Sequence, residues 1–164
     1  MNQEKDIRRL NLLGILHYVL GGFVAAFAFV ETIAFAIIGV IVTIFSLSEN
    51  IPPPSEWRGV IVATSWIAFV FLAISVALTW CLAICLFKSG RKLRQRKGRT
   101  FSKVIACIEF TLAFLVLLGL IGVPSPNEIK IGFVLFYVAM VILGAFTLIT
   151  LNKDSVKELY QVGK

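Results

Sequence analysis

The chain has 164 residues, of which 59% are hydrophobic, and it carries a formal net charge of +7. Its mean hydropathy is +0.92. A soluble domain of this length has no core large enough to hide so many apolar side chains, so the composition excludes an ordinary water-soluble globular protein and points to the lipid bilayer.

Four apolar stretches follow one another along the chain, at roughly 23–47, 60–87, 104–123 and 129–151. Each is long enough to cross a hydrocarbon layer about 30 Å thick, which requires about 20 helical residues. None of them alternates apolar and polar residues as the wall of a membrane barrel does. The sequence therefore predicts an all-α integral membrane four-helix bundle, with residues 1–164 forming a single domain.

The first apolar stretch is longer than one span requires, because its apolar character begins at Leu10 and continues to Leu47. Division into two spans at Glu31 would give five spans, and the charge pattern described below disfavours that alternative. We expect one span at 23–47, preceded by an amphipathic helical extension from about Gln3 that either lies in the interface or lengthens the span. A bend is expected, if anywhere, at the two glycines 21–22.

Basic residues are concentrated in three places: the N-terminal tail, the segment "KSGRKLRQRKGRTFSK" (88–103) and the C-terminal tail, which together hold fourteen of the sixteen Lys and Arg. With four spans, all three places lie on one side of the membrane. Positive charge beside short spans stays in the cytoplasm, so we expect both termini and a basic loop at 88–103 to be inside.

The basic loop is expected to contact anionic lipid headgroups, at about 1 kcal/mol for each basic residue near the surface. The predicted contacts are Lys88, Arg91, Lys92, Arg94, Arg96, Lys97, Arg99 and Lys103. A nucleic-acid partner is not expected, because the segment contains a single aromatic ring for base stacking, that of Phe101.

The other connections are short. Two proline-containing turns, at 48–58 and 124–130, are predicted to lie outside. After the fourth span, "LNKDSVKELYQVGK" is typical of a short amphipathic helix on the inner membrane surface. Asp154 or Ser155 is expected to cap this helix, and Val156, Leu159 and Tyr160 share its apolar face.

Two carboxyl groups, Glu31 and Glu109, lie inside predicted spans, where an ionisable side chain is costly unless it is paired, hydrated or neutralised. Both belong to stripes rich in small residues, and both are predicted in the cytoplasmic third of the bilayer, facing the bundle interior. We expect them to form a pair with at least one carboxyl protonated. The pair would be either a clip between two spans or a site for a proton or cation. His17, the single histidine, is expected to hydrogen-bond at the interface.

The chain contains no GxSxG, HExxH, Walker or dinucleotide signature, and Cys81 and Cys85 are four residues apart rather than in a CxxC motif. We therefore expect no enzymatic activity, no cofactor and no metal site. The favoured function is an accessory or assembly subunit, or a scaffold, of a membrane complex. The alternative is a small transporter or channel-forming oligomer that uses an intramembrane Glu. The small-residue patterns Gly22xxxAla26, Ala73xxxAla77 and Gly119–Gly122 favour close helix packing, either with other subunits or in a homo-oligomer.

Three segments together resemble a family of uncharacterised small bacterial four-span membrane proteins. They are "LNLLGILHYVLGG" (10–22), "RKLRQRKGRTF" (91–101) and "LGAFTLITLNKDSVKELY" (143–160). Those proteins begin with an "LLxIFHYVxGG" segment, have an arginine-rich central loop ending in "RTF", and close with "LGxFTLxVLxxxxVxxLY". The resemblance implies a single four-span domain, a cytoplasmic basic loop and the bacterial inner (plasma) membrane. It implies no activity and no residue roles.

Overall fold

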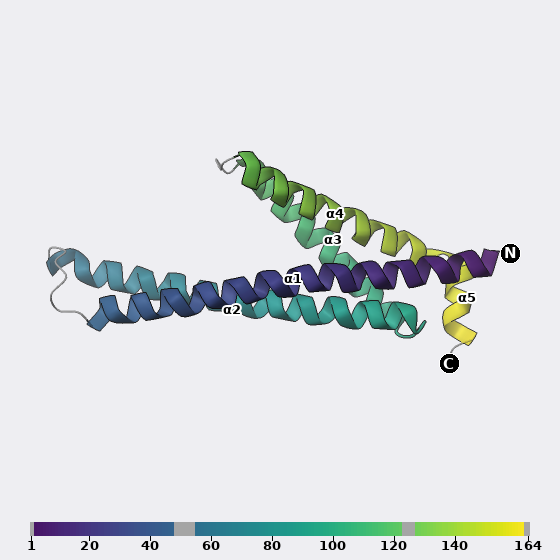
Figure 1. Cartoon of the computed structure of the whole chain (residues 1–164), viewed down its shortest axis with the longest axis horizontal. Coiled ribbons are helices and arrows are strands. Elements are labelled where there is room, and N and C mark those ends of the chain that lie inside the picture. The colour runs from purple at the N-terminus through teal and green to yellow at the C-terminus, as the bar shows by residue number, and fades with distance from the viewer. Residues whose placement is uncertain (1, 48–54, 123–126, 163–164) are drawn as a thin grey trace. The chain divides into compact units, whose positions relative to one another are not determined.

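The computed structural model describes residues 2–47, 55–122 and 127–162, which are almost entirely helical and include no strand (Figure 1). Within these ranges the chain forms α1 (Asn2–Leu47), α2 (Ser55–Arg94), α3 (Arg99–Gly122), α4 (Asn127–Asn152) and α5 (Asp154–Val162). The predicted all-α class is confirmed. The proline turns predicted at the outer surface fall largely outside the described residues, at 48–54 and 123–126.

Helices α1 to α4 are each long and apolar enough to cross a membrane. The candidate spans are Glu4–Ile44, Gly59–Arg94, Arg99–Gly119 and Ile131–Asn152. Helix α1 passes through Glu31 without interruption, so a division into two spans at that residue is wrong. The 46 residues of α1 extend over about 69 Å at 1.5 Å per residue. The predicted extension is therefore continuous with the first span.

The basic segment 88–103 differs from the predicted loop. Residues 88–94 form the last turns of α2, residues 99–103 form the first turn of α3, and only 95–98 connect the two helices. Lys and Arg are good helix formers, and their charges complement the C-terminal end of the α2 dipole, so the helix continues through most of the basic residues.

The connection itself is a helix-ending motif. The N–H of Lys97 donates to the carbonyl of Lys92 at 3.0 Å, and the N–H of Arg96 donates to Leu93 at 3.3 Å. Arg96 adopts a left-handed conformation with φ 54°. These features are those of a Schellman C-cap. Gly98, with φ 65°, is the residue immediately before α3, and its carbonyl accepts from the N–H of Ser102.

The chain forms two compact units: unit 1 comprises Met1–Gly21 and Cys85–Lys164, and unit 2 comprises Gly22–Ile84. The core of unit 1 gathers apolar side chains from the start of α1, the end of α2, the end of α4, and α5. Its buried members are Leu10, Leu13, Leu93, Leu151, Val156, Leu159 and Tyr160. The N-terminal region, the end of the basic α2 helix and the C-terminal helix thus meet at one place.

Close backbone approaches hold the helices of unit 1 together. A Cβ atom added to Gly90 of α2 would lie 2.8 Å from the carbonyl oxygen of Gly14 in α1. Helices α3 and α4 lie side by side (Figure 1), and a Cβ on Gly144 would lie 3.1 Å from the carbonyl oxygen of Ala106. The first distance is too short for a side chain without a shift of the helices, and the second is tight, so glycine favours both contacts.

Helix α5 confirms the predicted C-terminal helix, and its expected apolar face is buried. The face packs into the core of unit 1, whereas the sequence analysis expects it on the membrane surface. Neither proposed capping side chain is used as expected. Ser155 donates to Asp6 of α1, and Asp154 accepts from Lys157.

Unit 2 is a pair of antiparallel helical segments from α1 and α2. Phe35 stacks on Phe69 with ring centroids 4.4 Å apart, and the indole N–H of Trp80 donates to Thr32 at 3.1 Å. Most large apolar side chains of the unit are exposed, and its buried apolar residues are Val24, Ala28, Val42 and Ala83. Lipid or another helix is therefore required to cover its surface.

Candidate functional site

Glu109 lies on the buried face of α3. This face also carries Ser102, Ala106 and Ala113, and all four side chains have 0% exposure. The residues follow one another at spacings of four and three, which place them on one side of a helix. These positions of the third candidate span are therefore buried within unit 1, and Val116 on the same side is half-buried.

His17 of α1 is the partner of Glu109 in unit 1. Its Nε2 lies 3.5 Å from Oε2 of Glu109, and both side chains are fully buried. The Nδ1 atom lies 2.9 Å from the carbonyl oxygen of Leu13. A carbonyl oxygen accepts hydrogen bonds but cannot donate them, so Nδ1 carries the hydrogen of this bond. The structure buries His17 within unit 1 and gives it a hydrogen bond, while its expected position at the membrane interface stays a prediction.

This geometry leaves one proton to be shared between His17 and Glu109. With Nδ1 protonated, a neutral imidazole presents a lone pair at Nε2, which can accept from a protonated carboxyl. An imidazolium can instead donate from Nε2 to a carboxylate. In both arrangements the pair has no net charge, which makes it compatible with a low-dielectric interior.

Several buried polar atoms of unit 1 lack hydrogen-bond partners among the described residues, and the His17–Glu109 contact is itself an ion-pair approach without hydrogen-bond geometry. The unpartnered atoms are both carboxyl oxygens of Glu109, Nε2 of His17, and the hydroxyls of Ser89, Ser102 and Thr147. These atoms come from four helices. A buried polar atom without a partner is costly, and an enclosed water can satisfy it.

Close packing around the pair depends on glycines that the sequence analysis missed. Gly14, Gly90 and Gly144 make the backbone approaches described above. Single glycines inside helices give little signal by themselves, although Gly14 lies on the same stripe as His17 and Gly21. By contrast, a Cβ on Gly22 or Gly119, which belong to the predicted small-residue patterns, would meet nothing within 4 Å.

Glu31, the other predicted site residue, belongs to unit 2. Its side chain is half-buried, and its Oε2 is buried without a hydrogen-bond partner among the described residues. Thr32 beside it donates to the carbonyl of Ala28 and accepts from Trp80. Glu109 therefore contacts His17, and the expected pairing of Glu109 with Glu31 stays a prediction.

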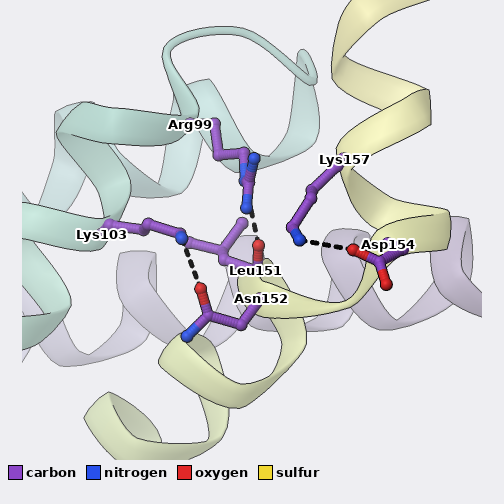
Figure 2. A network of polar contacts seen from close by, with 6 residues as sticks. All are labelled: Arg99, Lys103, Leu151, Asn152, Asp154 and Lys157. Atoms are coloured by element: carbon purple, nitrogen blue, oxygen red, sulfur yellow. Dashed lines mark hydrogen bonds and ion pairs between the residues drawn. The ribbon is translucent and has the colours of Figure 1, made fainter.

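Three basic residues of segment 88–103 make contacts within the protein, and the other five are exposed or half-buried. Figure 2 shows Arg99, whose Nε donates to the carbonyl of Leu151 at 2.9 Å, and Lys103, which donates to the side chain of Asn152. The ammonium of Lys92 lies 4.2 Å from the ring centroid of Phe101. These three residues fix the ends of the helices. Four others, Lys88, Arg91, Arg94 and Lys97, are exposed, and Arg96 is half-buried.

No group of three or more His, Cys, Asp or Glu that could hold a metal ion occurs in the described part of the chain. Comparisons with protein-family models, with curated proteins and with solved structures found no match for this sequence.

Proposed function

We propose that this chain is a non-enzymatic multi-pass protein of the bacterial inner membrane that acts as an accessory or assembly subunit of a membrane complex. The observation that carries the proposal is the contact between Glu109 and His17, fully buried and 3.5 Å apart. In this role the polar pair is a clip between α1 and α3. Its polarity stabilises one helix arrangement against alternatives in which a carboxyl would meet lipid.

The surface of unit 2 supports an assembly role. Phe29, Val30 and Ile33 are all about half exposed or more on α1, and the neighbouring Glu31 keeps a buried oxygen without a partner in the described residues. A helix from another protein that carries a donor would cover this face and satisfy the carboxyl. Interhelical hydrogen bonds of this kind are worth about 1 kcal/mol in membranes.

The orientation that we propose has both termini in the cytoplasm. Asp6 of α1, Leu93 of α2 and Val156 of α5 all belong to the same end of unit 1, through the Ser155–Asp6 hydrogen bond and the shared core. The three concentrations of Lys and Arg lie at or near this end. Retention of positive charge in the cytoplasm supports that side.

Site-specific photocrosslinking tests the assembly role. A photoreactive residue is placed at Phe29 in unit 2 or, as a control, at Leu135 in α4, because both side chains are well exposed, at 59% and 64%. We expect Phe29, but not Leu135, to give a crosslink to a different membrane protein, with a fixed number of partner molecules for each copy of this chain. Crosslinks to lipid alone at both positions would contradict the proposal, and a self-crosslink alone at Phe29 would favour a homo-oligomer.

A second candidate is a small proton or cation transporter that uses Glu109. The specific observation in its favour is the set of buried polar atoms of unit 1 that have no partner among the described residues, on Ser89, Ser102, Thr147 and Glu109 itself. Such atoms can coordinate water or a small cation and can pass a proton.

Replacement of Glu109 by Gln separates the two candidates, because Gln keeps a hydrogen-bonding amide but does not titrate. For a clip, Glu109→Gln retains assembly and the photocrosslink, whereas Glu109→Leu reduces both. For a transporter, Glu109→Gln assembles normally but abolishes proton movement by the purified protein in liposomes that contain a pH-sensitive dye. Liposomes without protein provide the baseline.

A further inference from the structure

A basic cleft of about 560 Å³ lies in unit 1 between the α2–α3 connection and α5. Its lining consists of Arg96, Lys97, Gly98, Arg99, Thr100, Lys157, Tyr160 and Gln161. Four of these side chains are cationic and none is acidic. Three of the lining residues come from α5, so this cleft is distinct from the diffuse positive charge expected of segment 88–103.

The first turn of α3 adds backbone donors to the cleft. Gly98 is the residue before the helix, because its carbonyl accepts the first helical hydrogen bond, from Ser102 at 3.2 Å. The N–H groups of Arg99 and Thr100 therefore have no partner within the helix. Gly98 has no side chain to cap them, and a helix N-terminus of this kind attracts anions. Gly98 has a φ of 65°, in the left-handed region that favours glycine.

Tyr160 is an independent indication of a ligand. Its side chain is 8% exposed and lines the cleft, and its hydroxyl has no hydrogen-bond partner among the described residues. Burial raises the pKa of Tyr160 to about 12, and the charge of Arg99 opposes this rise. The hydroxyl therefore keeps its proton at neutral pH and can donate to an acceptor. A buried hydroxyl in the lining of a cleft that also holds cationic side chains and open backbone N–H groups matches an oxyanion with several acceptor oxygens.

The cleft also lies at the level where headgroups are expected. Arg99 is the first residue of one candidate span, and Asn152 is the last residue of another. Figure 2 shows Arg99 and Lys157 approaching the end of α4 from α3 and α5. Lys157 is partly neutralised by Asp154, which leaves Arg96, Lys97 and Arg99 as the main charges.

We propose that this cleft binds a phosphate monoester, carried either by a membrane lipid or by a soluble molecule. A monoester presents up to two negative charges and three terminal oxygens, enough to engage the arginines, the Tyr160 hydroxyl and the α3 N-terminus together. A diester headgroup has one charge and fewer free oxygens, so it should bind more weakly.

The test uses the purified full-length chain in detergent, with bound molecules counted by native mass spectrometry. The probes are phosphatidic acid, phosphatidylglycerol with the same acyl chains, and glycerol 3-phosphate. We expect phosphatidic acid or glycerol 3-phosphate to bind about tenfold more tightly than phosphatidylglycerol. Binding of phosphatidic acid alone identifies a lipid ligand, and displacement of it by glycerol 3-phosphate extends the site to soluble monoesters.

Two variants distinguish a built site from general charge attraction. Lys97→Gln removes a cation from the cleft, and Lys88→Gln makes the same change at an exposed position of α2 that does not line it. Tyr160→Phe removes only the hydroxyl and keeps the buried ring. We expect Lys97→Gln and Tyr160→Phe each to weaken monoester binding about tenfold, as loss of a hydrogen bond to a charged group does, while Lys88→Gln has little effect.

Equal losses for Lys97→Gln and Lys88→Gln, or unchanged binding in Tyr160→Phe, would overturn the proposal. Thermal unfolding of each variant shows that it is folded. Because the photocrosslinking test depends on unit 2, failure here and failure of the proposed assembly role are separate outcomes.

Discussion

Ser155 in α5 donates a 2.7 Å hydrogen bond to the carboxylate of Asp6 in α1, across 149 residues of sequence. Asp6 is 5% exposed, and its other oxygen lies 3.7 Å from Arg9. A carboxylate so well buried needs such partners. The bond therefore ties the C-terminal helix to the first turns of the chain and positions the apolar face of α5 over the core of unit 1.

Loss of the apolar contact of α5 should destabilise unit 1. Leu159, which is 7% exposed, packs in the core with side chains from α1, α2 and α4. Leu159→Ala should lower the free energy of unfolding by about 2 kcal/mol or more, measured by denaturant unfolding in detergent. Glu158→Ala, at the exposed neighbouring position, should change it by less than about 0.5 kcal/mol. Equal effects would mean that α5 does not dock as described.

The contact between α1 and α2 should be sensitive to a single methyl group. In Gly90→Ala the new Cβ would lie 2.8 Å from the carbonyl oxygen of Gly14 and 3.3 Å from Cβ of His17. Separation of the helices should cost about 1–3 kcal/mol. Gly22→Ala is the matched control, because a Cβ there meets nothing within 4 Å and Ala favours helix. Thermal unfolding should rank Gly90→Ala below the parent and Gly22→Ala at or above it.

The membrane spans and the terminal helix could be predicted because their signals are local. About 20 consecutive apolar residues are enough to indicate a span, and the spacing of Val156, Leu159 and Tyr160 defines one helical face. The sequence predicts a loop at 88–103, whereas α2 continues through Lys88–Arg94. Charge indicates the side of the membrane, but it does not end a helix.

The partner of Glu109 could not be predicted from depth. A first span limited to 23–47 places Glu31 and Glu109 at similar depth, and this depth alone favours their pairing. Helix α1 is instead continuous from Asn2, and the backbone contact of Gly14 with Gly90 sets its register against α2 in unit 1. The stripe containing His17 was visible in the sequence, but its neighbour depends on packing between distant segments.

Alkaline pH should release α5. Burial raises the pKa of Tyr160 from 10.0 to about 12, so the folded state favours the protonated phenol. The resulting stability is fully present below pH 10 and is lost as pH rises through about 12. Protease cleavage of the C-terminal segment should therefore increase over this window in the parent protein. Tyr160→Phe should show a smaller increase, and an identical pH profile in both proteins would contradict the assignment.

Low pH should weaken the ion pair between Asp154 and Lys157 in α5. The hydrogen bond from Lys157 and its charge lower the pKa of Asp154. A carboxyl whose pKa is lowered on folding gives stability that is present above the pKa of a free Asp, about 4, and is lost as pH falls through the folded-state pKa. The exposed pair is screened by solvent, so we expect only slightly greater cleavage of the C-terminal segment below pH 4. Asp154→Asn should remove this pH dependence, and its persistence in that variant would assign it to another carboxyl.

Membrane orientation should follow the distribution of positive charge. In a variant without Cys81, Cys85 and Cys107, a cysteine placed at Gln95 is expected to resist a membrane-impermeant thiol reagent added outside. A cysteine at Pro53 should react. The reason is that Lys and Arg flanking short spans stay in the cytoplasm, and Gln95 lies in the turn between the two basic helix ends. Labelling of both positions after the cells are opened provides the control. Outside labelling at 95 but not at 53 would invert the orientation, and it would place the phosphate cleft and both chain ends on the outer side of the membrane.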